Sequence, residues 1–208
     1  LPGFEPYVHE HLFPDASHDE AFNRFLHAVR VLVKSYGEDK VVVLNSGLGM
    51  PWQTAGDCCM WESFIFSWAW SGRRHTWTDV KAKAKANQWY LEAGRRIVAL
   101  SFLDPERHDM KKDAVWAFAC ARLVDFVFWA SLDHTEAQFL NTVHLGRALG
   151  PFQEADQVAH RFFDKGLIVL NDGPDEREIA LARPAGFQAE RLLDLGDGKR
   201  SVPFDKGG

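Results

Sequence analysis

The stretch Asp57-Cys58-Cys59-Met60-Trp61-Glu62-Ser63 has the character of a short, buried β-strand that ends on a carboxylate. Short apolar runs without helical spacing favour strands, and three more such runs occur along the chain. They are Lys40 to Asn45 (KVVVLN), Arg95 to Phe102 (RRIVALSF) and Asp125 to Ser131 (DFVFWAS). These runs lack the alternation of apolar and polar residues, which is typical of strands in a sheet covered on both faces. We therefore expect four buried strands.

Helical segments precede or separate these strands. Ser17 is the expected N-cap of an amphipathic helix that ends at Gly37, and Asp109 is expected to cap a helix through Leu123. A third helix is predicted from Thr76 to Ala93, with Gly94 as its stop. Six apolar residues recur at helical spacing in the first helix: Phe22, Phe25, Leu26, Val29, Leu32 and Val33. The predicted order is helix, strand, strand, helix, strand, helix, strand.

Short apolar strands that alternate with helices indicate parallel βα units, and hence an α/β fold. Both a doubly wound sheet and a TIM barrel satisfy this pattern. A doubly wound sheet is expected to carry a glycine-rich phosphate turn, and neither GxGxxG nor GxxxxGK[ST] follows any predicted strand. The pattern therefore favours a partial TIM barrel.

The sequence changes character after a predicted helix around Thr135 to Leu145. Short extended runs alternate with Asp-Gly, Gly-Pro and Arg-Pro turn signals, which indicates a small antiparallel β domain. The runs are Arg161 to Phe163, Gly166 to Asn171, Arg177 to Ala182 and Gln188 to Leu193. We expect a boundary near residues 146–157, so that residues 1–150 belong to a TIM-barrel domain and residues 151–208 to a β-sandwich-like domain. Because the chain opens at Leu1 without an initiator Met, we interpret it as a C-terminal fragment.

Composition excludes several classes of function. The chain has 208 residues, a formal net charge of -5 and a pI near 6.0, and the short run Lys81, Lys83 and Lys85 cannot track a phosphate backbone, so no nucleic-acid partner is expected. No apolar stretch approaches the roughly 20 residues of a membrane helix, so no membrane partner is expected. The three cysteines form no disulfide framework or metal motif, and we interpret them as core residues. Compartment and oligomeric state are left open.

Polar side chains stand where the predicted strands end. Asn45 ends the first strand, Glu62 and Ser63 end the second, Asp104 follows the third, and Ser131 to Asp133 follow the fourth. In a barrel, reactive groups project from the carboxyl ends of the strands. Asp57 begins its strand instead, so we expect a structural role for it.

Two segments resemble a known group of enzymes. Leu145 to Gly150 (LGRALG), then Arg161-Phe162-Phe163 and Lys165 to Asn171 (KGLIVLN), resemble the strand pair with which glycoside hydrolases of TIM-barrel type enter a C-terminal β-sandwich. The strand ending in Trp61-Glu62-Ser63 is similar to the "D-G-V-x-x-E" strand of that group, which includes barrels similar to endo-α-1,4-polygalactosaminidases. The resemblance implies a glycoside hydrolase that acts on a poly- or oligosaccharide without a cofactor.

Glycosidic cleavage generally needs two carboxyl groups. Glu62 suits the general acid because apolar neighbours, Met60, Trp61 and Phe64, are expected to desolvate it and raise its pKa. The second carboxylate is left open between Glu10, Asp104, Asp133 and a residue upstream of this chain. A structural alternative for Glu62 is a helix cap or an ion pair with Arg73 or Arg74.

Aromatic and polar side chains complete the predicted sugar site. Sugar rings stack their C–H faces on tryptophans, and Asn45 is expected to hydrogen-bond a sugar hydroxyl. The other predicted substrate-binding residues are Trp52, Trp68, Trp70, His9, His11 and Asp133. An alternative for Trp68 and Trp70 is an edge strand that packs under a neighbouring loop.

His9-Glu10-His11-Leu12-Phe13 supports a different class of function. The motif resembles the metal-binding HxH of amidohydrolases of the phosphotriesterase-like branch, which would imply a metal-dependent hydrolase. Such a site needs further histidines at later strand ends, where this sequence has Asn45, Glu62, Phe102 and Ser131. Our main interpretation therefore includes no metal. A third class is a non-catalytic carbohydrate-binding barrel.

Overall fold

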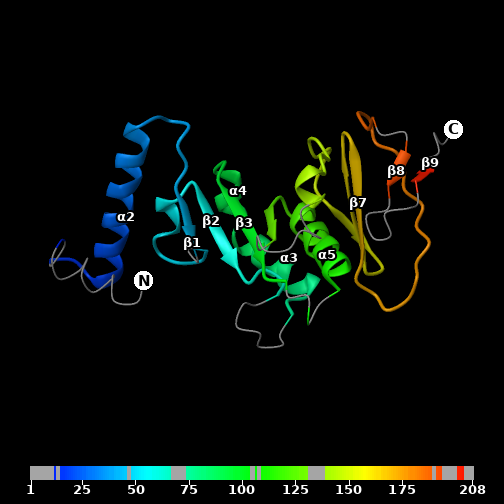
Figure 1. The fold of residues 1–208 in the computed structure, drawn as a ribbon, viewed down its shortest axis with the longest axis horizontal. Helices are drawn as coiled ribbons and strands as arrows, with labels where there is room; N and C mark the ends of the chain where they lie inside the picture. Colours follow the sequence, from blue (N-terminus) through cyan, green and yellow to red (C-terminus); the bar gives the residue numbers. More distant parts are fainter. Residues whose placement is uncertain are drawn as a thin grey trace. The chain divides into compact units, whose positions relative to one another are not determined.

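The computed structural model describes residue 12 and residues 15–45, 48–66, 74–103, 106, 109–130, 139–188, 191–193 and 201–203. Figure 1 shows the order of elements along the chain. They are α2 (His18–Ser35), β1 (Val43–Asn45), the 3₁₀-helix η2 (Gln53–Ala55), β2 (Cys58–Glu62), α3 (Trp77–Ala86), α4 (Gln88–Glu92), β3 (Arg96–Ser101), α5 (Met110–Leu123), β4 (Val127–Ala130), η3 (Phe139–Thr142), β5 (Gln153–Ala155), β6 (Val158–Phe163), β7 (Gly166–Asn171), β8 (Arg191–Leu193) and β9 (Ser201–Pro203).

The strands form three sheets. A parallel sheet has the order β1-β2-β3-β4, an antiparallel sheet has the order β5-β6-β7, and β8 pairs with β9 in antiparallel fashion. The predicted α/β fold, with parallel strands followed by a small antiparallel sheet, is confirmed. Within the described ranges, no helix has the length and apolar character needed to cross a membrane.

The chain divides into two compact units. The first contains α2, β1, η2, β2, residues 85–86 of α3, α4 and residues 96–99 of β3. The second contains residues 77–84 of α3, residues 100–101 of β3, α5, β4 and the elements that follow. Each unit has its own buried polar cluster.

Helix α2 is bounded by the residues that its sequence predicts. The Ser17 hydroxyl accepts a hydrogen bond from the Glu20 N–H at 3.4 Å, and Asp19 and Glu20 place negative charge at the positive end of the helix. Gly37 follows the helix with a φ of 146°, a value that favours glycine. The predicted helix from Ser17 to Gly37 is therefore confirmed.

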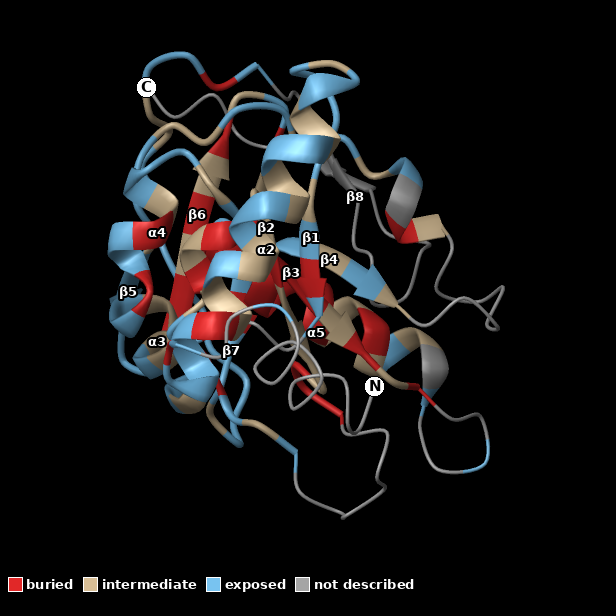
Figure 2. Ribbon diagram, turned by 90° about the vertical axis from the view of Figure 1, so that its left-hand side faces the viewer, coloured by how far each residue is buried: buried red, intermediate tan, exposed pale blue. Residues whose placement is uncertain are grey.

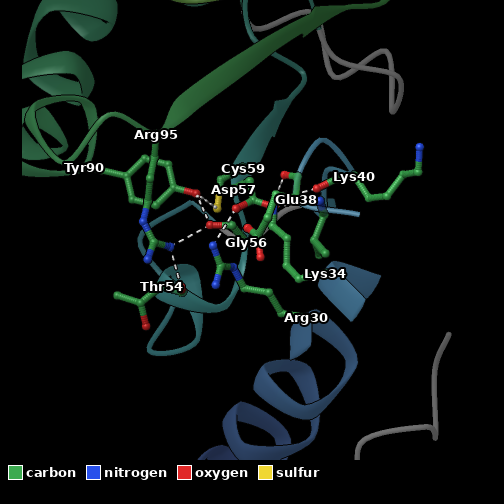
Figure 3. A network of polar contacts seen from close by, with 11 residues as sticks. Arg30, Lys34, Glu38, Lys40, Thr54, Gly56, Asp57, Cys59, Tyr90 and Arg95 are labelled. Carbon is green, nitrogen blue, oxygen red and sulfur yellow. Dashed lines mark hydrogen bonds and ion pairs between the residues drawn. The ribbon is translucent and has the colours of Figure 1, made fainter. Parts of the chain in front are cut away.

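Asp57 joins α2 to the starts of β1 and β2 in the first unit (Figure 3). Its carboxylate accepts hydrogen bonds from Arg30 Nη2 at 2.7 Å and from the Val42 N–H at 3.0 Å, and Lys34 Nζ lies 3.3 Å away. Burial raises the pKa of Asp57, but these hydrogen bonds and the Arg30 charge outweigh it, so the pKa is lowered. These contacts support the structural role predicted for Asp57.

A second set of contacts in the first unit fixes α4 against the loop before β2 (Figure 3). The Tyr90 hydroxyl donates to the Gly56 carbonyl at 3.1 Å and accepts from Cys59 Sγ at 3.3 Å. Arg95 Nη1 donates to the carbonyls of Gly56, at 2.6 Å, and Thr54. Burial raises the pKa of the Cys59 thiol, as expected for a core cysteine rather than a reactive one.

In the second unit, α5 packs against β6 and β7. Asp109 caps α5 as predicted, since its carboxylate accepts from the Lys112 N–H at 3.1 Å. The helix buries a face of small residues together with Phe118, which allows close approach to the sheet. Figure 2 shows β3 and β6 as largely buried strands.

Arg161 on β6 anchors the antiparallel sheet to the C-terminal end of α5. Its side chain is only 8% exposed. The guanidinium donates to the carbonyls of Leu123 and Gly150, at 2.9 and 2.8 Å, and to Asp125 Oδ2 at 2.8 Å. A cation at this position complements the partial negative charge of a helix C-terminus.

Glu154 on β5 makes a further connection to α3 in the second unit. Lys81 Nζ lies 2.7 Å from both carboxylate oxygens, and the indole N–H of the buried Trp77 donates to Glu154 Oε1 at 3.3 Å. Lys81, which the sequence marked only as part of a short basic run, therefore has a structural partner.

Burial along the outer strands differs from the prediction. Val43 on β1 is 48% exposed, and Val127 and Trp129 on β4 are 44% and 39% exposed. The expected cover on both faces holds for β3 and is wrong for β1 and β4. β1 and β4 are the outermost strands in the order of the sheet, and every second residue in each of them is exposed.

Three predicted segments need correction. The helix expected over Thr76 to Ala93 is divided into α3 and α4 at Asn87, whose buried side chain accepts a hydrogen bond from Gln53 at 3.1 Å. The strand expected over Arg177 to Ala182 is wrong: the backbone is irregular there, and residues 177–180 are exposed and have no partner strand among the described residues. Of the helix expected around Thr135 to Leu145, the described part has only η3.

Candidate functional site at the carboxyl ends of β1 and β2

Asn45 and Glu62 lie at the same edge of the parallel sheet, on the same face. The register pairs Asn45 with Met60, and Glu62 is two residues further along β2. Side chains two residues apart on a strand share a face, and strand geometry places the Asn45 and Glu62 Cα atoms about 8 Å apart. Leu44 and Cys59, on the opposite face, are buried. The sequence therefore predicted correctly which polar residues end these two strands.

The surroundings of Glu62 are only partly apolar. Phe64 is fully buried, whereas Met60, Trp61 and Glu62 itself keep partial exposure. The burial expected around Glu62 is thus incomplete. Arg74, one of the expected structural partners, lies 4.0 Å from Asp113 and stacks over the Trp116 ring. Arg73 is outside the described residues.

Ser63, directly after Glu62, has a left-handed backbone with a φ of 61°. Three other non-glycine residues in the described ranges share this conformation, and each has an ordinary reason: Asp125 ends α5, and Asp156 and Gln157 form the β5–β6 turn. Ser63 instead lies at the end of an interior strand. Unusual backbone at such a position is found often at functional sites.

Trp52, the third predicted site residue that the structure describes, has a packing role. Its ring meets the Phe22 ring edge-on, with centroids 5.0 Å apart, and thereby joins the loop between β1 and β2 to α2. The nearby Thr54 hydroxyl lies 3.4 Å from His27 Nε2. A sugar-stacking role for Trp52 stays a prediction beside this observed contact.

The remaining predicted site residues lie outside the described residues. They are Glu10, Asp104, Trp68, Trp70, His9, His11 and Asp133. The identity of a second carboxylate and of the tryptophan platform therefore stays a prediction. In the ranges that the structure describes, no group of three or more His, Cys, Asp or Glu residues is arranged to hold a metal ion.

The described part of the site can perform acid–base chemistry. A carboxylate at an accessible edge can donate or accept a proton, and an amide on the same face can hydrogen-bond a hydroxyl group. Asp57, directly before β2, is held in ion pairs with Arg30 and Lys34.

Sequence reasoning missed a cluster of basic residues in the second unit. Arg122, His144 and Lys165 line one pocket, although they are far apart along the chain. No motif links the three residues, so a local pattern could not have found them.

Comparison of the chain with protein-family models finds no match, and comparison with curated proteins finds none either.

Proposed function

We propose that this chain is part of a TIM-barrel glycoside hydrolase, in which Glu62 serves as general acid or base in the cleavage of an O-glycosidic bond. The expected substrate is a poly- or oligosaccharide, and Asn45 would bind one of its hydroxyl groups. The resemblance of the Trp61-Glu62-Ser63 strand to that group of enzymes is the starting point of this proposal.

The order of the parallel strands supports a barrel. Each strand from β1 to β4 adds beside the previous one, so the sheet grows in one direction. Doubly wound sheets instead reverse direction at a switch point, where their ligands bind. Sequential addition is the order of a barrel, in which catalytic groups stand at the carboxyl ends of the strands.

The observation that carries the catalytic proposal is the position of Glu62. It is partly exposed, ends an interior strand of the parallel sheet, shares a face with Asn45 and precedes the left-handed Ser63. The last residues of β1 to β4 are Asn45, Glu62, Ser101 and Ala130, and among these four Glu62 is the one that carries a carboxylate. A partner carboxylate would come from Glu10, Asp104, Asp133 or a residue upstream.

The experiment is the release of reducing ends from a panel of polysaccharides, including α-1,4-linked polygalactosamine, by the full-length protein. Glu62→Gln keeps the shape of the side chain but cannot exchange a proton, so turnover should fall about 100-fold or more. Glu178→Gln is the matched control, because Glu178 lies in exposed, irregular chain, and it should leave turnover unchanged.

Other outcomes separate the alternatives. Full activity of Glu62→Gln with an intact fold would contradict the role of Glu62. Binding of a glycan without cleavage would favour the carbohydrate-binding barrel, and hydrolysis that is lost on chelation and restored by a divalent metal would favour the metal-dependent hydrolase.

A further inference from the structure

A pocket of about 570 Å³ lies in the second unit, beside the C-terminal half of α5 and the start of β4. Its lining combines buried apolar side chains, including Phe118 and Leu140, with the basic residues Arg122, His144 and Lys165. The described residues that line it include no acidic side chain. The volume falls in the range of small-molecule sites.

Arg122 is half-buried and has no carboxylate partner among the described residues. Its guanidinium lies over the Phe163 ring, with 5.3 Å between the guanidinium carbon and the ring centroid. Asp125, whose charge acts on Arg122, is engaged at 2.8 Å by Arg161. Asp164, next to Lys165, accepts a hydrogen bond from the Arg147 N–H at 3.0 Å.

A half-buried guanidinium without a counter-ion is costly for a protein to maintain. Burial lowers the pKa of Arg122, the Asp125 charge raises it in part, and the positive charge of Arg161 lowers it further. The region around Arg122 therefore has an excess of positive charge in incompletely solvated surroundings. An anion bound there would balance the positive charge and give the half-buried guanidinium a counter-ion.

The apolar part of the lining sets a second requirement on the ligand. Val127 lines the pocket and is 44% exposed, and the Phe118 and Phe128 rings meet edge-on with centroids 5.7 Å apart. The exposed apolar surface of Val127 favours contact with an aromatic or aliphatic group over contact with a fully hydrated ion. Lys165 is exposed and supplies positive charge to the same pocket, and the exposed His144 ring adds a polar group.

We propose that this pocket binds a small organic anion, a carboxylate on an aromatic or short aliphatic body, with Arg122 as the main anchor of the carboxylate. The apolar body would cover Val127, and Lys165 would add charge. The site shares no residue with the Glu62 edge, so it is independent of the proposed glycosidase activity.

The test measures binding to the full chain by isothermal titration calorimetry, with 3-phenylpropionate as the probe. Arg122→Gln should weaken binding about tenfold or more, because a charge-assisted hydrogen bond contributes on the order of one to two decades of affinity. Lys112→Gln is the matched control: it removes a positive charge from the same helix, ten residues away and outside the pocket lining, and should leave binding unchanged. Lys165→Gln, at an exposed position, should weaken binding about two- to fivefold without affecting the fold.

Two further probes test whether the ligand needs both a negative charge and an apolar group. The uncharged 3-phenylpropionamide should bind at least about tenfold more weakly than the acid, and sulfate alone should also bind more weakly because it lacks an apolar body. The proposal is overturned if the acid does not bind at millimolar concentration, if the amide or sulfate binds equally well, or if Arg122→Gln and Lys165→Gln both retain wild-type affinity.

Discussion

The Arg161 cluster of the second unit and the Asp57 cluster of the first unit both pair arginine with aspartate, but the buried partner differs. In the second unit the arginine is buried, with 8% of its side chain exposed, whereas Asp125 is 57% exposed. In the first unit both charges are partly enclosed, since the side chains of Asp57 and Lys34 are 20% and 18% exposed and that of Arg30 is 33% exposed. The cost of desolvation therefore falls mainly on the arginine in the second unit and on both charges in the first.

The guanidinium groups of Arg161 and Arg30 also differ in the hydrogen bonds that they make. Arg161 uses Nε, Nη1 and Nη2, and its acceptors include the Leu123 carbonyl at the end of α5. Arg30 bonds through Nη2, and its buried Nε has no hydrogen-bond partner in the described part of the chain. Arg161 is thus stabilised mainly by backbone carbonyls and a helix end, whereas Asp57 combines one backbone N–H with the charges of Arg30 and Lys34.

The largest effect is expected from Arg161→Met. The substitution fills much of the same space but leaves the carbonyls of Leu123 and Gly150 without their donor, so the free energy of unfolding should fall by about 3 to 5 kcal/mol. Urea denaturation at pH 7 measures the change. Arg161→Lys should recover only part of the loss, because an ammonium group cannot reach acceptors in several directions as a guanidinium does.

Arg177→Met is the matched control for this prediction, because Arg177 is exposed in irregular chain. It should change stability by less than about 0.5 kcal/mol. A similarly small change for Arg161→Met would show that water replaces the guanidinium at the carbonyls, and the contrast with the Asp57 cluster would then be lost.

A smaller loss is expected from Asp57→Asn. The amide oxygen can still accept from the Val42 N–H, but Arg30 and Lys34 lose their shared counter-charge. For a partly exposed cluster we expect a loss of about 1 to 2 kcal/mol, between the values of surface and buried pairs. Asp39→Asn is the control: Asp39 also pairs with a lysine, at 2.8 Å, but is 77% exposed, and its loss should not be measurable.

The pH dependence of the Asp57 effect has a definite sign. The folded-state pKa of Asp57 is lowered, so it lies below the unfolded value of about 3.9. The stabilising contribution is therefore fully present above that unfolded value and is lost as the pH falls through the folded-state pKa. The difference in unfolding free energy between wild type and Asp57→Asn should shrink from pH 7 toward pH 2.5. A difference that grows in acid would contradict the ion-pair explanation.

The sequence predicts the features that depend on local signals. Ser17 and Asp109 cap the helices that they were expected to cap, and Glu62 ends the strand that it was expected to end. These predictions succeed because a cap or a strand end is determined by residues within one turn or one strand of each other.

Features that depend on distant partners were not predictable in this way. The partners of Arg161 lie up to 39 residues away along the chain, and Arg30 is 27 residues from Asp57. The exposure of Val43 depends on which other elements cover that face of the sheet, and the sequence of one strand carries no information about those elements. Asp57 is an intermediate case, since its place before β2 predicted a structural role without revealing its partners.

The smallest effect is expected from Asp125→Asn, which removes the charge that faces Arg161. Asp125 is mostly exposed, so screening by solvent reduces the contribution of its charge, and the loss should be below about 1 kcal/mol. Asparagine also tolerates the left-handed backbone of this position, where φ is 63°. Asp125→Ala loses the acceptor and adds backbone strain, so it should cost about 1 to 2 kcal/mol. If Asp125→Asn instead destabilises the protein as much as Arg161→Met, the carboxylate rather than the carbonyls stabilises the buried arginine, and the two clusters are alike after all.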